Sequence, residues 1–123
     1  MLLVEDNPIY QRVAQRLLVL WGHEVQVAGN GLEGVERAAE GSYDIVLMDV
    51  QMPELDGLEA TRRIRGLGEQ HPMSYAPIVA MPANSDREDR AACFEAGMDA
   101  FLLKPIDVAA FRALLRQRCC ELH

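Results

Sequence analysis

The sequence predicts an α/β protein in which a five-stranded parallel sheet is covered by helices on both faces. Short apolar segments alternate along the chain with longer segments whose apolar residues recur at helical spacing, and this alternation is typical of repeated βα units. The expected strands are largely apolar, which indicates burial on both faces. A chain of 123 residues suffices for the core of one domain, and we expect one domain spanning residues 1–123.

Each strand is predicted from a short apolar run, and each helix from residues that favour helix ends. The expected strands are Leu2–Val4, Glu24–Ala28, Ile45–Met48, Ile78–Met81 and Ala100–Leu103. The residues that mark the five helices are Asp6-Asn7-Pro8 and Gly22, Asn30 and Gly41, Asp56 and Gly66, Ser85-Asp86-Arg87-Glu88 and Gly97, and Asp107. Proline favours a first helical turn, Ser-x-x-Glu is a capping box, and glycine favours the position after a last turn.

The composition argues against several classes of protein. The formal net charge of −7 disfavours direct nucleic-acid binding, because phosphate contacts need a basic surface. No apolar run approaches the roughly 20 residues of a membrane span. The three cysteines do not form the spaced, even set of a disulfide framework. We therefore expect a cytoplasmic domain that is not embedded in a membrane and does not bind nucleic acid directly.

Charged side chains follow three of the predicted strands, at the edge where the carboxyl ends of a parallel sheet meet. Glu5 and Asp6 follow the first strand, Asp49 the third, and Lys104 the fifth. Three carboxylates in one crevice repel one another unless a cation lies among them, and a set of oxygen ligands with room for water suits Mg²⁺. A carboxylate between Mg²⁺ and an ammonium group is arranged to accept a phosphoryl group, since the charge on the transferring oxygens is neutralised from both sides. The sequence thus predicts an aspartyl phosphate.

Four segments resemble, in order and spacing, the motifs of the receiver domains of two-component and phosphorelay response regulators. They are LLVEDNP, DIVLMDVQMPELDG, PIVAMPANS and DAFLLKPI. The resemblance covers essentially the whole chain, and it implies a doubly wound, flavodoxin-like (βα)5 fold with strand order 2-1-3-4-5. The segments EDNPIYQRVAQRLL and MDVQMPELDGLEATRRIR are more similar to receivers attached to hybrid sensor kinases than to those of transcription factors.

The resemblance implies a role for each residue of the crevice. Asp49 is expected to be the phosphoacceptor and a metal ligand. Asp6 is expected to bind Mg²⁺, with Glu5 supporting the metal, often through water. The backbone carbonyl of Gln51 is a further expected ligand, and Lys104 is expected to pair with the phosphoryl oxygens.

Three further residues have expected roles in positioning or switching. Pro105 is a candidate cis-proline that aims the preceding lysine. Phe101 occupies the aromatic switch position of the family, and the alternative that it only packs in the core stays open. Pro82 stands where the family usually has threonine or serine, whose hydroxyl hydrogen-bonds a phosphoryl oxygen. Proline has no hydroxyl, and its ring fixes φ, so we expect phosphorylation with a weakened conformational response.

A sensor histidine kinase or a histidine phosphotransfer domain is the partner that the resemblance implies. We expect it to dock over the first helix near Ile9, Tyr10 and Val13, because that helix has two apolar stripes and one suffices for the core. Whether the second stripe adds packing or forms the docking face stays open. The domain is expected to catalyse its own phosphorylation and dephosphorylation, and the resemblance allows a parent chain that is a membrane-anchored hybrid histidine kinase.

Three other functions fit parts of the pattern. A flavodoxin-like cofactor binder would need a Ser/Thr/Gly-rich phosphate loop after the first strand, where Glu5-Asp6-Asn7-Pro8 would repel a phosphate. A phosphatase with an aspartyl nucleophile usually has an Asp-x-Asp pattern, which Asp49-Val50-Gln51 lacks. A degenerate receiver that binds partners without being phosphorylated stays open because of Pro82.

Overall fold

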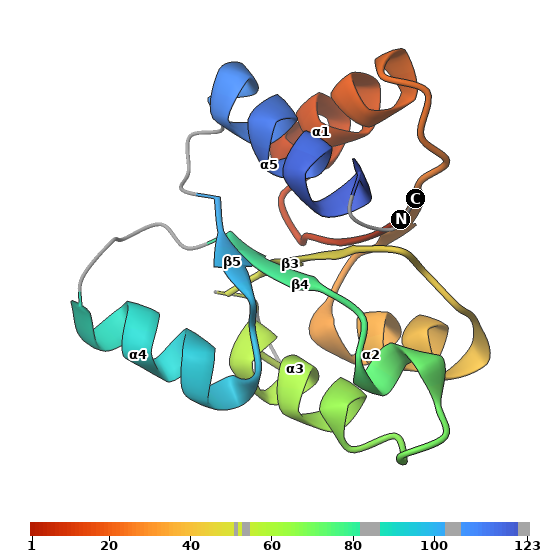
Figure 1. Ribbon diagram of the computed structural model, residues 1–123, viewed down its shortest axis with the longest axis vertical. Helices are drawn as coiled ribbons and strands as arrows, with labels where there is room; N and C mark the ends of the chain where they lie inside the picture. The colour runs from red at the N-terminus through yellow and green to blue at the C-terminus, as the bar shows by residue number, and fades with distance from the viewer. Residues whose placement is uncertain (51, 53–54, 82–86, 103–106, 121–123) are drawn as a thin grey trace.

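In a computed structural model of the chain, five parallel strands form one sheet in the order β2-β1-β3-β4-β5 within the described residues (Figure 1). The structure describes residues 1–50, 52, 55–81, 87–102 and 107–120. The elements are β1 (Leu2–Val4), α1 (Pro8–Leu20), β2 (Gln26–Ala28), α2 (Gly31–Glu40), β3 (Val46–Asp49), α3 (Gly57–Arg65), the 3₁₀ turn η1 (Pro72–Ser74), β4 (Ile78–Met81), α4 (Arg87–Ala96), β5 (Ala100–Phe101) and α5 (Val108–Cys120). The predicted fold class and strand order are confirmed.

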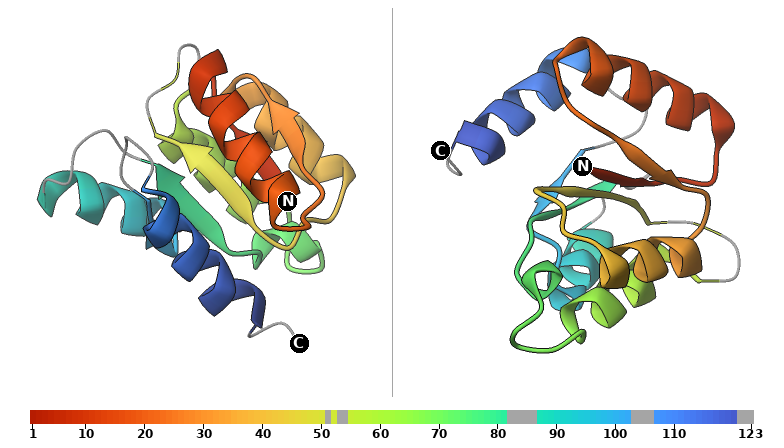
Figure 2. Two further views of the ribbon diagram at one scale, coloured as in Figure 1. Left: turned by 90° about the horizontal axis from the view of Figure 1, so that it is seen from above. Right: turned by 90° about the vertical axis from the view of Figure 1, so that its right-hand side faces the viewer.

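Helices cover both faces of the sheet (Figures 1 and 2). Helices α1 and α5 lie on one face, and α2, α3 and α4 lie on the other. Successive residues of a strand therefore enter different halves of the core, as the period of two requires. Leu47 packs with Leu18 and Phe111 beneath α1 and α5, whereas Val46 and Met48 pack on the side of α2, α3 and α4. No helix in the described part of the chain is long and apolar enough to cross a membrane.

Three of the expected strands begin or end at different residues. β2 starts at Gln26, not at Glu24, although the Glu24 carbonyl still accepts a hydrogen bond of 2.8 Å from the Met1 amino group. β3 runs on to Asp49, which pairs with Met81 of β4. β5 ends at Phe101. The amide of Leu102 donates to the Ala80 carbonyl at 2.7 Å, and Leu103 lies outside the described residues.

Most of the predicted helix ends are confirmed by their hydrogen bonds. The side chains of Asn7, Asn30 and Asp56 each accept a bond from a backbone amide in the first turn of the helix that follows. Gly22 and Gly97, after α1 and α4, have φ angles of 86° and 109°, which favour glycine. The first two residues of the capping box predicted for the fourth helix lie outside the described residues, and α4 starts at Arg87.

The two apolar stripes of α1 have different environments. Ala14 and Leu18, from the stripe that starts at Tyr10, are buried against the sheet. The other stripe consists of Ile9, Val13, Leu17 and Leu20. Ile9 is 70% exposed and Leu20 is 77% exposed, whereas Leu17 packs partly against the core, so most of this outward stripe faces solvent. At the end of the helix, the Trp21 ring meets the Phe111 ring of α5 edge to face, with the ring centroids 5.4 Å apart. The docking role of the outward stripe stays a prediction.

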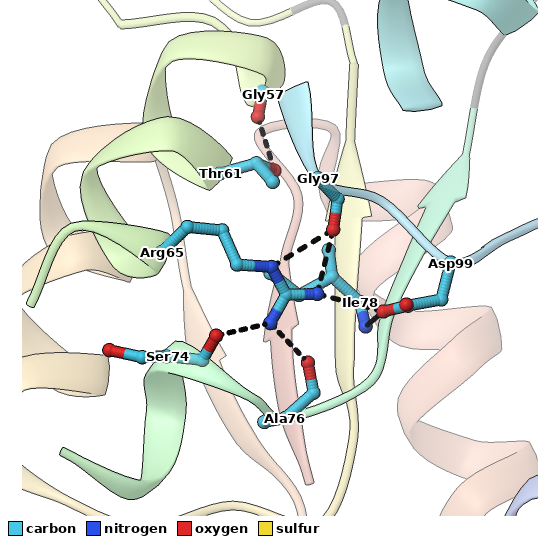
Figure 3. A network of polar contacts seen from close by, with 8 residues as sticks. All are labelled: Gly57, Thr61, Arg65, Ser74, Ala76, Ile78, Gly97 and Asp99. Carbon is cyan, nitrogen blue, oxygen red and sulfur yellow. Dashed lines mark hydrogen bonds and ion pairs between the residues drawn. The ribbon is translucent and has the colours of Figure 1, made fainter. Parts of the chain in front are cut away.

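A side-chain network ties the end of α3 to the amino-terminal end of β4 (Figure 3). Arg65 donates hydrogen bonds to the carbonyls of Gly97, Ser74 and Ala76, and its Nη2 lies 2.8 Å from Asp99 Oδ2. The same carboxylate oxygen accepts a bond of 2.9 Å from the Ile78 amide. This network holds the loop after α3, the loop before β5 and the start of β4 together.

Candidate functional site

Three carboxylates lie together at the carboxyl edge of the two central strands β1 and β3. Val4 and Met48 are register partners in these neighbouring parallel strands, so the residues that follow them, Glu5 and Asp49, reach the same edge side by side. With Asp6, each of these residues offers one carboxylate oxygen, and the three oxygens lie within 4.8 Å of one another. The structure therefore brings together the three acidic residues that the sequence singled out.

The carboxylates of this cluster differ in their exposure to solvent. Glu5 is fully buried and Asp49 is 2% exposed, whereas Asp6 is exposed. Backbone contacts hold the buried members: the Glu5 amide donates to the Ala28 carbonyl at 3.0 Å, and the Gln11 side chain donates to the Glu5 carbonyl. Asp49 is the last residue of β3 and is flanked by β1 and β4. The cluster is thus a fixed, acidic site with one side open to water.

The donor set of the cluster fits a hard divalent cation. Carboxylate oxygens are the ligands that Mg²⁺ prefers, and it usually binds one or two carboxylates together with several waters. Buried carboxylates this close to one another repel, and a bound cation relieves the repulsion. Asp6, the exposed member of the cluster, is in contact with solvent. The same negative charge disfavours the phosphate group of a flavodoxin-like cofactor.

Glu33, near the start of α2, is not part of this cluster, and its carboxylate contacts residues close to it in the sequence. Its Oε2 accepts a hydrogen bond of 3.0 Å from the Gly29 amide, and its Oε1 lies 3.3 Å from Arg37 Nε. The bond from Gly29 is the main cause that lowers the pKa of Glu33, the Arg37 guanidinium lowers it further, and partial burial opposes both. This carboxylate completes the cap that Asn30 begins, a role that the Asn-x-x-Glu spacing could have indicated.

Phe101 packs between β5 and α4. Its ring meets the Phe94 ring edge to face, with the centroids 4.8 Å apart and the planes at 87°. The guanidinium carbon of Arg90 lies 5.6 Å from the centre of the Phe101 ring. Phe101 is half-buried, so the packing role that the sequence left open is present, and its role as a switch stays a prediction.

Four of the predicted site residues lie outside the described residues. They are Gln51, Pro82, Lys104 and Pro105. Their roles as metal ligand, switch, phosphoryl partner and positioning proline stay predictions.

Two buried glycines were not predicted from the sequence: Gly57, which lies against the backbone of Asp49, and Gly31, which lies against Leu55. Both are the first residue of a helix, directly after a side-chain cap. The Gly57 amide donates to the Val50 carbonyl at 3.0 Å, which joins the start of α3 to the residue after Asp49. The sequence marks these glycines only by the dipeptides Asn30-Gly31 and Asp56-Gly57. Such dipeptides indicate a turn or a helix cap and do not indicate contact with a functional site.

Comparisons with known proteins agree with this geometry. Residues 1–116 match the family described as the response regulator receiver domain. The chain is 38% identical over 139 residues to histidine kinase 5 of Arabidopsis thaliana, which covers 94% of the chain and 15% of that protein. It is 44% identical over 113 residues to hybrid signal transduction histidine kinase B of Dictyostelium discoideum, which covers 85% of the chain and 6% of that protein. The chain therefore spans a small part of the length of these relatives.

Two solved structures share both the fold and part of the sequence. One is the receiver domain of sensor histidine kinase PA1611 from Pseudomonas aeruginosa PAO1 with a magnesium ion coordinated in the active site cleft. It is 40% identical with a TM-score of 0.85, and the match covers 94% of this chain and 93% of that one. The other is the co-crystal structure of the Saccharomyces cerevisiae histidine phosphotransfer protein Ypd1 with the receiver domain of the response regulator Ssk1. That match is 29% identical with a TM-score of 0.88, and it covers 97% of this chain and 87% of that one.

Proposed function

The chain belongs to the response regulator receiver family, and we propose that it accepts a phosphoryl group on Asp49 from a phosphohistidine donor. The observation that carries this proposal is the cluster of Glu5, Asp6 and Asp49, whose carboxylate oxygens lie within 4.8 Å of one another. Such an acidic pocket is typical of phosphoryl-accepting receivers. Asp49 is almost fully buried at the end of a central strand, so its carboxylate has a fixed position for attack.

Mg²⁺ is the proposed cofactor, and Glu5, Asp6 and Asp49 would hold it together with the backbone carbonyl of Gln51. When bound, the ion neutralises negative charge on the oxygens of the phosphoryl group in transfer. Lys104 is proposed to neutralise the same charge from the other side, and Pro105 to aim that lysine. The magnesium ion in the related Pseudomonas aeruginosa receiver supports this assignment.

The proposed reaction moves one phosphoryl group between two side chains. A carboxylate oxygen of Asp49 attacks the phosphorus atom, and an O–P bond forms while the N–P bond of the phosphohistidine breaks. The leaving nitrogen keeps the electron pair of that bond, and the imidazole leaves as a neutral group when its other nitrogen carries a proton. Asp49 reacts as the carboxylate and releases no proton. Attack of water on the phosphorus later returns the carboxylate and inorganic phosphate.

The proposed partner is a histidine phosphotransfer domain or the histidine domain of a kinase. The outward stripe of α1 supports docking there, because Ile9 and Val13 are 70% and 40% exposed on the helix that begins two residues after Asp6. The Ypd1–Ssk1 complex shows a related receiver bound to such a phosphotransfer protein. The relatives named above make a hybrid histidine kinase the proposed parent, with this domain in the cytoplasm.

Proline at position 82 is proposed to weaken the response to phosphorylation while leaving the chemistry intact. One hydrogen bond to a charged phosphoryl oxygen is lost, and such bonds contribute about 1.5 to 3 kcal/mol. This loss is comparable with the few kcal/mol that separate two conformational states. A relay carrier or a phosphate sink fits such a domain better than a strong output switch.

Intact-mass measurement with acetyl phosphate and Mg²⁺ tests the proposed phosphoacceptor. The unmodified protein is expected to gain one phosphate, Asp49→Asn to gain none, and the matched control Asp44→Asn to behave as the unmodified protein, because Asp44 is exposed before the start of β3. A phosphate adduct on Asp49→Asn would contradict the assignment. The absence of an adduct on the unmodified protein would favour the degenerate receiver.

Amide NMR spectra with and without beryllofluoride, a mimic of the phosphoryl group, test the weakened response. Small changes through α4 and β5 are expected in the unmodified protein, and larger changes in Pro82→Thr. Changes of equal size in both proteins would refute a weakened switch.

A further inference from the structure

The start of α3 lies directly on the backbone of Asp49. Gly57, the first residue of that helix, is buried, and a Cβ atom added there would lie 2.1 Å from the Asp49 carbonyl oxygen and 2.9 Å from the Cα of Val50. These atoms all belong to the backbone, so no side-chain rotation relieves the contact. Any residue other than glycine at this position must therefore move Asp49 or the helix.

The first turn of α3 is held by hydrogen bonds within the helix, and the helix as a whole is held by its contacts with the core. Asp56 caps the helix by accepting a bond of 2.9 Å from the Glu59 amide. The buried hydroxyl of Thr61 donates to the Gly57 carbonyl at 2.7 Å, as Figure 3 shows, and the side chain of Ile64 is fully buried in the core. The two hydrogen bonds keep the first turn of the helix intact. Withdrawal of the helix would expose Ile64 and break the bonds from Arg65 to the carbonyls of Gly97 and Ala76, whereas Asp49 lies at the end of a strand. A side chain at position 57 is therefore relieved at least partly by movement of Asp49.

A second glycine supports this arrangement from α2. A Cβ atom added to Gly31, the first residue of α2, would lie 2.2 Å from the carbonyl oxygen of Leu55. Leu55 is followed by the helix cap Asp56 and then by Gly57. The start of α2 therefore lies against the segment that leads into α3. Gly31 is buried as well, and the contact again involves backbone.

We propose that Gly57 and Gly31 are positioning residues, whose lack of a side chain sets the position of the Asp49 carboxylate relative to Asp6 and Glu5. This inference rests on the proposed function, because it concerns the rate at which Asp49 reacts. Gly57 acts directly on the Asp49 backbone, and Gly31 acts through Leu55 and the start of α3. Misplacement of a reacting group on the order of 1 Å lowers a rate by about 100-fold, so even a partial shift of Asp49 has a measurable effect.

The test compares Gly57→Ala and Gly31→Ala with two matched glycine substitutions. Gly66→Ala, at the other end of α3, and Gly29→Ala, just before α2, introduce Cβ atoms with nearest distances of 3.4 Å and 3.7 Å, which are ordinary contacts. For each protein, urea unfolding gives the folded fraction, and the rate constant of phosphorylation by acetyl phosphate is measured at saturating Mg²⁺. A merely structural role would lower the free energy of unfolding and leave the rate constant of the folded protein unchanged.

The expected rate constant for Gly57→Ala is at least about tenfold below that of the unmodified protein, with a smaller loss for Gly31→Ala and none for the two controls. If Gly57→Ala does not fold, the loss in Gly31→Ala relative to Gly29→Ala decides. Wild-type rate constants in the folded variants would overturn the inference. If the unmodified protein is not phosphorylated, the proposed function fails instead, and the Mg²⁺ dissociation constants of the same proteins decide: weaker binding in Gly57→Ala supports the inference and equal binding overturns it.

Discussion

Replacement of Arg65 by methionine is expected to lower the free energy of unfolding by about 3 kcal/mol, although Arg65 takes no part in the proposed chemistry. The guanidinium makes five hydrogen bonds, at 2.7 to 3.1 Å, to the carbonyls of Gly97, Ser74 and Ala76 and to Asp99. A bond to a charged group contributes about 1.5 to 3 kcal/mol, but water replaces part of this network because the Arg65 side chain is 21% exposed. A net loss equal to about two such bonds gives the estimate.

Urea unfolding at fixed pH and salt measures this loss, and Arg62→Met is the matched control. Arg62 lies on the same helix, and its pair with Glu59 is about half exposed, so its replacement is expected to cost no more than about 0.5 kcal/mol. For a domain of this size the Arg65 variant should also melt about 10 °C lower. The network lies at the start of β4, away from the acidic cluster, so phosphorylation of the folded variant should be unchanged.

Equal losses in Arg65→Met and Arg62→Met would refute the conclusion that the network joins three parts of the fold. A full loss of phosphorylation in a folded Arg65→Met protein would equally contradict it, since the network would then act on the site.

Three further expectations concern the metal, the acid stability and the partner. In Asp6→Asn the rise in melting temperature on adding Mg²⁺ should be much smaller than in the unmodified protein, because a ligand that binds only the folded state stabilises it by mass action; an equal rise would mean that the ion binds elsewhere. The folded-state pKa of Glu33 is lowered, so its carboxylate contributes stability that is present above the ordinary value of 4.5 and is lost as pH falls through the folded-state pKa. Glu33→Gln should therefore lose less stability below pH 4.5 than the unmodified protein does in urea unfolding, and parallel losses would contradict this role. Ile9→Glu should slow phosphoryl transfer from a phosphorylated histidine phosphotransfer domain but should not slow phosphorylation by acetyl phosphate. The control Tyr75→Glu, at a residue as exposed as Ile9, should slow neither reaction. Equal loss of both reactions in Ile9→Glu would mean that the site itself is damaged.

The sheet and the acidic cluster could be predicted from the sequence because both depend on local patterns. Apolar runs such as Ile45–Met48 identify the strands, and the rule that parallel strands share a carboxyl edge brings Glu5 and Asp49 together. Caps such as Asn30 and Asp56 depend on contacts within one helical turn. These features need no knowledge of how distant segments pack.

Features that depend on packing between elements could not be predicted in the same way. The outward direction of Ile9 follows from the way α1 lies on the sheet, and both stripes of that helix are apolar in sequence. The contacts of Gly57 with the Asp49 backbone and the five bonds of Arg65 join residues whose separation is set by the whole fold. An arginine near the end of a helix has no local pattern that identifies its carbonyl partners.

The most direct test of the central claim is to locate the phosphoryl group chemically. An aspartyl phosphate is an acyl phosphate, which borohydride reduces to an alcohol, so a phosphorylated aspartate becomes homoserine. After treatment with acetyl phosphate, Mg²⁺ and borohydride, peptide mass spectrometry should find homoserine in place of Asp49, the last residue of β3. No homoserine should form when the phosphodonor is omitted. Homoserine at Asp6 or another aspartate, with Asp49 unchanged, would contradict the account.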